Sequence, residues 1–368
     1  MFAAAAVALA GCAKSEVLDV AQYERPISFD PFVENQTKAT NDITDGTEAF
    51  KEFYVFGAKG TKEDNAFTAD QNGGETYLNH VQVSGGKGSW TYYPHVSWVA
   101  NKTFRFAAYA NGTGDGTVRD SDASVISSSN EAKLANVTFV TNDANNKWGL
   151  DISGYTVRDR DLIVAVPEEK LVGEISTAPA SVGMTFKHAL AKVIIQFRYN
   201  RTVGSNLQAQ IEPFSFNAFK TGNCVVRYTG DNTNNTIGAT WTTTGTASAY
   251  EFFPAASTND FVTWADGNKQ QEMYVIPQSN SGITIDKITL NTINSNGETT
   301  STVEYKDVSL TISGHTDWKP GYVYRYIADV NTQEHYIHFT TSVTSWIDED
   351  NRNQNITAST TSSDTNLQ

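Results

Sequence analysis

Apolar and polar residues alternate with a period of two along much of the chain, which indicates β-strands that each bury one face. The stretch 89–110 shows this clearly, because its apolar side chains occupy even-numbered positions: Trp90, Tyr92, Val96, Trp98, Phe104 and Phe106. The intervening positions include polar residues: Thr91, His95, Ser97 and Arg105. We therefore predict two strands here, each with one buried face.

The alternation recurs in the C-terminal half, where three sets of residues each line one strand face: Val308, Leu310 and Ile312; Tyr322, Tyr324 and Tyr326; Ile337, Phe339 and Val343. Clusters of Asn, Gly and Asp mark turns between the strands, and no convincing amphipathic helix exceeds three turns. The sequence thus predicts an all-β protein with a pair of sandwiches. The first strand is expected over 26–33, with Ile27, Phe29 and Val33 buried, and the next near 53–56.

One segment changes the phase of its alternation. Apolar residues occupy even positions at Met184, Phe186 and Leu190, and odd positions at Val193, Ile195 and Phe197. A shift of one residue turns a strand's buried face outward, and a β-bulge accommodates it. We predict such a bulge near 189–191, with both sets of side chains facing inward.

The length of 368 residues suggests two domains. The segment 168–181 contains Gly173, Pro179 and small residues, and we place the domain boundary there. The expected division is an N-terminal β-sandwich domain over 12–178, a C-terminal β-sandwich domain over 179–350, and a polar, mobile tail over 351–368.

The chain opens with an uncharged apolar run, 2–10, which is too short to span a bilayer and is typical of a secretory signal peptide. The run ends Leu9-Ala10-Gly11-Cys12, which resembles the bacterial lipobox, although no basic residue precedes the run. Residues 1–11 are thus expected to be removed, and Cys12 to carry the lipid that anchors the exported protein to the outer membrane. The alternative is a buried N-terminal strand with an incidental cysteine.

Charge and cysteine content narrow the function classes. The net charge of −14 repels phosphate backbones, so no nucleic-acid partner is expected. Cys224 remains alone once Cys12 is lipidated, so no internal disulfide is expected. His335 and His338 form H-x-x-H in a predicted strand, where a spacing of three puts them on opposite faces rather than on one metal. His188 lies on the apolar phase, and we expect a core histidine bonded to a backbone carbonyl.

No enzymatic motif stands out. The acidic residues Asp115, Asp231 and 348–350 do not fit the twelve-residue calcium loop, GGKGS at 85–89 fails the P-loop pattern, and G-x-S-x-G is missing. We expect no enzyme, no cofactor and no metal, although a glycosidase carboxylate pair stays open because carboxylates are numerous. The aromatic residues Trp90, Tyr92 and Trp98 either stack on sugars or, since they share the phase of the apolar residues, pack in the core.

A series of segments resembles the fimbrillin family, the subunits of type V pili on Gram-negative anaerobes. In the family's order these are ISF at 27–29, TKAT at 37–40, FYVFG at 53–57, WTYYPHVSW at 90–98, FRFAAYA at 104–110, DLIVA at 161–165, FKHALAKVIIQF at 186–197 and TSVTSWID at 341–348. The resemblance implies two transthyretin-like Greek-key β-sandwich domains in tandem.

The resemblance also implies a function. The chain would be a structural subunit or accessory protein of a fimbrium, tethered by its lipid and cut by a trypsin-like protease after the first strand. A strand of a neighbouring subunit would then fill the groove by donor-strand exchange, in service of adhesion to a host or bacterial surface receptor. Lys38 and Ala39 are the expected cleavage position; the alternative is that Lys38 is a solvated loop charge. The rival class is a surface glycan-binding lipoprotein with tandem β-sandwich domains.

Overall fold

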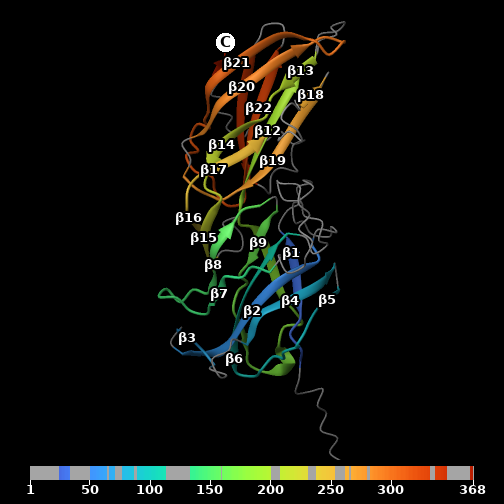
Figure 1. Cartoon of the computed structure of the whole chain (residues 1–368). Coiled ribbons are helices and arrows are strands. Elements are labelled where there is room, and N and C mark those ends of the chain that lie inside the picture. Colours follow the sequence, from blue (N-terminus) through green and yellow to red (C-terminus); the bar gives the residue numbers. More distant parts are fainter. Residues whose placement is uncertain are drawn as a thin grey trace, which may run out of the picture.

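The computed structural model shows an all-β chain (Figure 1). It describes residues 25–33, 50–63, 66–70, 77–86, 89–112, 133–158, 160–199, 208–230, 238–252, 262–264, 267–279, 282–331, 336–345 and 365–367. Within these ranges the only helical element is the 3-10 turn η3 (Ile175–Thr177), and none of them contains a helix long and apolar enough to cross a membrane. The prediction of an all-β fold is confirmed.

Nine strands from the N-terminal half of the chain, between Phe29 and His188, form the first sheet. They are β1 (Phe29–Val33), β2 (Glu52–Glu63), β3 (Ala66–Ala69), β4 (Leu78–Gly86), β5 (Ser89–Tyr92), β6 (Lys102–Asn111), β9 (Leu162–Ala165), β10 (Lys170–Val172) and β11 (Val182–His188). Their order is β1-β11-β9-β6-β2-β4-β5, with β10 beside β6 and β3 beside β2. The pair β1–β11 is parallel, whereas the other pairs in this sheet are antiparallel.

The first sheet closes on itself through the residues that precede β1. Pro26 forms an antiparallel bridge with Ser97, and Ile27 N donates to Val96 O at 2.9 Å. The curled sheet encloses an apolar cluster whose members include Ile27, Phe29, Val33, Phe53, Trp98, Phe104, Phe106, Met184 and Phe186. The first strand therefore belongs to the core of this half, as the alternation over 26–33 predicts.

A second group of strands forms a sandwich toward the C-terminus, in the upper part of Figure 1. One sheet has the order β19 (Gly267–Val275), β12 (Ala191–Tyr199), β22 (Tyr322–Asn331), β23 (Tyr336–Ser345) and β24 (Thr365–Leu367). The facing strands are β18 (Val262–Trp264), β13 (Gln208–Ile211), β20 (Ile283–Ile293) and β21 (Thr299–Leu310), with the pair β14 (Phe214–Ala218) and β17 (Ser248–Phe252). Of the expected tail, residues 365–367 pair with β23, and 351–364 lie outside the described residues.

A four-stranded sheet joins the two groups. Its order is β16 (Ala239–Thr244), β15 (Thr221–Arg227), β8 (Gly149–Thr156) and β7 (Val137–Val140). β7 and β8 precede β11 in the chain, whereas β15 and β16 follow β12. This connecting sheet lies between the two groups of strands in Figure 1, so segments from both halves of the sequence build it together.

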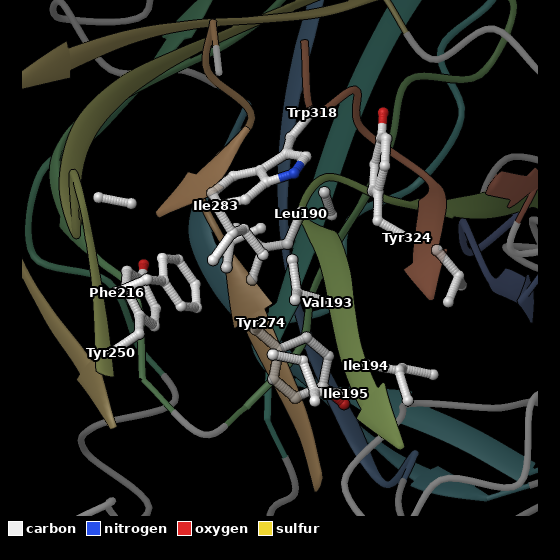
Figure 2. Packing of buried hydrophobic residues seen from close by; sticks show 14 of the residues in the cluster. Leu190, Val193, Ile194, Ile195, Phe216, Tyr250, Tyr274, Ile283, Trp318 and Tyr324 are labelled. Atoms are coloured by element: carbon white, nitrogen blue, oxygen red, sulfur yellow. The ribbon is translucent and has the colours of Figure 1, made fainter. Parts of the chain in front are cut away.

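The larger apolar cluster extends from one face of β2, β6 and β9 through the connecting sheet into the C-terminal sandwich. Figure 2 shows Leu190, Val193 and Trp318 turned toward Ile283 of β20, whereas Ile194 points to the opposite side of β12. Val193, Ile195 and Phe197 are fully buried, and so are Met184, Phe186 and Leu190. The inward orientation predicted for both sets is therefore confirmed.

The predicted bulge at 189–191 is wrong. β11 and β12 are separate strands in different sheets, because Ala189 N donates to Leu162 O at 2.8 Å while Leu190 O accepts from Gly321 N at 2.8 Å. The phase of the alternation changes because the chain leaves one sheet and enters another. β11 lies beyond the boundary expected at 178/179 and pairs with β1 and β9.

The prediction that each strand over 89–110 has only one buried face is wrong for β6. The strand β6 carries Phe104 and Phe106 inward as predicted, but Arg105 on its opposite face is only 1% exposed. β6 is a central strand that is covered on both faces, and its burial pattern contains no exposed residue. The two strands predicted within 89–110 are β5 and β6, and Tyr92 of β5 is buried, as is Trp98 between them.

Candidate functional site: the first strand and its groove

The residues on which lipid attachment and cleavage depend, Cys12, Lys38 and Ala39, lie outside the described residues, so their roles stay predictions. His335 lies outside them as well. The structure does describe β1, which stands between the expected tether and the expected cleavage position. The candidate site is therefore β1 together with the groove in which it lies.

The side chains of β1 alternate between the core and the surface. Phe29, Pro31 and Val33 are buried, whereas Asp30 and Phe32 are exposed. Phe32 is 51% exposed. The strand thus buries a row of alternate side chains on one side only, as strands with one buried face do.

Phe29 is the central side chain of this row. Its ring lies 6.2 Å from that of Phe53 and 5.8 Å from that of Phe106, in both cases edge to face, and 5.4 Å from that of Tyr92. Edge-to-face aromatic pairs are favourable beyond the area that they bury. Three aromatic side chains from β2, β5 and β6 therefore form a box that fits one ring of the first strand.

The backbone of β1 is held along a single edge. The strand pairs with β11 in parallel, from Phe29 opposite Val182 to Val33 opposite Phe186, and within the described part of the chain it has no other partner strand. Pro31 fits this position, because proline lacks an N–H and occurs in sheets at edges. Ile27 N donates to Val96 O on the side away from β11, and by alternation the nitrogen of Pro31 faces that same side.

The residues just before β1 are held more firmly, on both edges. Ile27 O accepts from Tyr92 Oη at 2.8 Å, and Trp98 N donates to Arg25 O at 2.9 Å. On the other edge, Ser28 O accepts from Val182 N at 2.8 Å, and Ser28 Oγ donates to Ala180 O at 2.6 Å. Burial raises the pKa of Tyr92, so its hydroxyl keeps the proton that it donates.

This arrangement is the one by which a sheet accepts a peptide as an added strand: main-chain bonds along an edge, and pockets for alternate side chains. Taking β1 away would expose the aromatic box and the edge of β11, and an extended segment with apolar residues at alternate positions would fit the vacated groove.

The described histidines that the sequence offers as candidate metal ligands or catalytic groups lie elsewhere in the fold. His188 is a core histidine, as predicted. Its Nδ1 lies 2.7 Å from Oδ2 of Asp161, so the partner of this nitrogen is a carboxylate and the predicted backbone carbonyl is wrong. Both side chains are buried, and no spacing in the sequence pairs them. His338 lies on β23. The part of the chain that the structure describes contains no group of three or more His, Cys, Asp or Glu side chains placed to hold a metal ion.

The aromatic residues that the structure describes do not form a platform for sugars. Tyr92 and Trp98 are buried, as core packing requires, and Trp90 is partly buried against the apolar cluster of the first sheet. Among the described side chains of Trp and Tyr, only Tyr93 is exposed, at 86%. A sugar-binding surface needs several coplanar exposed rings, so these residues favour the core interpretation.

The sequence does not predict the buried polar cluster around Arg105. Its guanidinium donates to Thr141 O at 2.9 Å and to Asn146 Oδ1 at 3.0 Å, and it lies over the rings of Phe67 and Trp148 at 4.4 and 4.5 Å. The Trp148 ring in turn stacks on that of Tyr228 at 4.2 Å. The cluster therefore links the first sheet to the end of β15, and its partners are too distant in sequence for any local pattern to show it.

A family model described as fimbrillin-like matches residues 37–346, and no curated protein matches the chain. Among solved structures, a fimbrial protein from Bacteroides vulgatus has 14% identity and a TM-score of 0.49, covering 88% of this chain and 99% of its own. The fimbrial anchor protein Mfa2 from Porphyromonas gingivalis has 10% identity and a TM-score of 0.29, with coverage of 88% and 98%.

Proposed function

The chain belongs to the fimbrillin-like family, and from this we propose that it is a structural subunit or accessory protein of a cell-surface fimbrium, a type V pilus, that serves adhesion. The observation that carries the proposal is β1, a five-residue strand with buried side chains that is paired along one edge. Such a strand is the element that another subunit would replace. The proposed partners are therefore other fimbrial subunits.

We propose two transthyretin-like Greek-key β-sandwich domains in tandem. The pairing of β11 with β1 and β9 supports a crossing point at Ala189–Leu190, so that β11, which lies beyond the expected boundary at 178/179, belongs to the N-terminal domain. On this division the replaceable strand and the whole of its groove belong to the N-terminal domain.

The chain is proposed to be exported as a lipoprotein anchored to the outer membrane at Cys12. Metabolic labelling with a palmitate analogue tests this. Cys12→Ala should abolish the label, whereas Cys224→Ala, which removes the other cysteine, should leave it unchanged. Label that persists after Cys12→Ala would refute lipid attachment at this position.

Cleavage after Lys38 is the proposed step that makes β1 replaceable. β1 ends at Val33 and β2 begins at Glu52, so a cut between them separates the strand from the rest of the sheet. One cut then frees the chain from its lipid and leaves β1 held by non-covalent contacts. Donor-strand exchange would follow, with a strand of a neighbouring subunit in the groove.

N-terminal sequencing of sheared surface filaments tests the cleavage step. The filaments should contain chains that begin at Ala39, and Lys38→Ala should leave a full-length, membrane-bound monomer. Arg25→Ala is the matched control, because a trypsin-like enzyme cuts poorly between Arg25 and Pro26, and this variant should assemble normally. Normal assembly of Lys38→Ala would show that this cut is not the step that releases the strand.

A further inference from the structure

We propose that an incoming strand enters the groove at the Val33 end of β1 and displaces the resident strand toward Arg25. The proposal rests on the proposed function, because it assumes that β1 is the strand that is replaced. It adds the direction of replacement and the place on this chain where a neighbouring subunit first binds.

The two ends of the resident segment are held unequally. Residues 25–28 have main-chain bonds on both edges, to 96–98 on one side and to Val182 on the other. Residues 29–33 pair with β11 alone among the described strands. Local opening occurs where backbone pairing is sparse, so the Val33 end opens first.

Side-chain contacts show the same inequality. At the Arg25 end, the hydroxyls of Tyr92 and Ser28 bind main-chain carbonyls across the two edges. At the Val33 end, Pro31 has no N–H to offer a partner, and Phe32 exposes half of its side chain. An incoming strand thus meets an apolar side chain and an edge without a partner among the described strands at one end, and a segment with both edges occupied at the other.

Chain connectivity adds a further difference. A cut after Lys38 leaves Val33 a few residues from a new chain end, while Arg25 stays continuous with the segment that leads to Cys12. The less restrained end of a strand frays more readily. Replacement from Val33 therefore proceeds stepwise, and the bonds at Ile27 and Ser28 break last.

Two engineered disulfides test the direction of replacement. Each links β1 covalently to β11 through side chains on the face away from the core, one at each end of the paired strands. Phe32→Cys with Thr185→Cys closes the Val33 end, and Ser28→Cys with Ser181→Cys closes the Arg25 end. Paired strands lie about 4.8 Å apart, within the range of Cα distances that disulfides span. Both are made in the full chain with Cys12→Ala and a specific protease site inserted between Lys38 and Ala39; Cys224 is buried.

The measurement is capture of a labelled peptide with the sequence of residues 26–33 after the inserted site has been cut. The oxidised Ser28/Ser181 pair should still capture the peptide in a complex that retains β1. The oxidised Phe32/Thr185 pair should capture it about tenfold more slowly or not at all, and reduction should restore capture.

Other outcomes separate the two proposals. Capture by the oxidised Phe32/Thr185 pair but not by the Ser28/Ser181 pair would reverse the direction, and equal behaviour of the two oxidised pairs would contradict an ordered entry. A cut chain without either disulfide that captures no peptide and retains β1 would instead contradict the replaceable strand itself, and with it the proposed function.

Discussion

Arg105 donates two hydrogen bonds to the same carboxylate oxygen of Glu169, from Nε at 3.1 Å and from Nη2 at 2.9 Å. The arginine side chain is 1% exposed and the glutamate side chain 20% exposed. Lys62 reaches the other carboxylate oxygen, Oε1, from the surface. A charged group at a strand centre is thus neutralised by a partner from the loop between β9 and β10.

Removing the arginine is expected to destabilise the fold strongly. Arg105→Met should lower the free energy of unfolding by roughly 3 kcal/mol, because it takes the buried partner from a largely desolvated carboxylate. Lys62→Met is the matched control, since it removes the more exposed contact to the same carboxylate and should cost less than about 1 kcal/mol. Urea unfolding measures both, and equal losses would contradict the special role of the buried pair.

The ion pair between Arg105 and Glu169 also makes the free energy of unfolding depend on pH. Burial alone would raise the pKa of Glu169, but hydrogen bonds from Lys62 and Arg105 outweigh it and hold the pKa below its ordinary value of 4.5. A carboxyl with a depressed pKa stabilises the fold above the unfolded value, and this contribution is lost as pH falls through the folded value. The stability difference between the wild type and Arg105→Met should thus narrow from pH 7 to about pH 3; a constant difference would count against the ion pair.

Phe197 should contribute strongly to the stability of the larger apolar cluster. It is fully buried, and its ring meets that of Phe214 edge to face at 5.9 Å. Phe197→Ala should cost roughly 3–5 kcal/mol in the free energy of unfolding. The control is Phe32→Ala, half exposed on β1, which should change stability by less than about 0.5 kcal/mol. A loss below about 1 kcal/mol for Phe197→Ala would place this strand at the periphery.

His80 should disfavour folding in mild acid. Burial first, and then the charge of Lys133, lowers the pKa of His80 to about 4 from 6.5. Between these values the unfolded chain binds a proton that the folded chain does not, so stability should fall as pH drops through this window. His80→Asn removes the group and keeps a residue type that tolerates the positive φ of 55° found there. Its pH profile should be flatter than that of the exposed control His95→Asn.

Cys224 should be inert in the folded protein. Its side chain is fully buried, and burial, with a smaller effect from Asp151, raises the pKa of the thiol. Thiols react as thiolates, so a chain with Cys12→Ala should show no reaction with a thiol reagent until denaturant is added. Rapid labelling of the native chain would mean that β15 opens readily.

The sequence predicts those features that a buried face imposes locally. The spacing of Ile27, Phe29 and Val33 places them on one buried face, because a strand with one buried face must alternate. The change of phase before Val193 was also visible, but a bulge and a passage between sheets produce the same pattern. Arg105 and the partner of His188 were not predictable, since the residues that accommodate them, Glu169 and Asp161, come close only in the folded chain.

The connecting sheet determines how the molecule responds to a pull on its two ends. β8 and β15 lie on opposite sides of the passage at Ala189–Leu190, yet a ladder joins them from Thr156 and Thr221 to Gly149 and Arg227. Stretching must break this ladder before the halves can part, so the passage does not bear the load alone. Tension is shared across a sheet, and the two halves resist extension as one stiff segment.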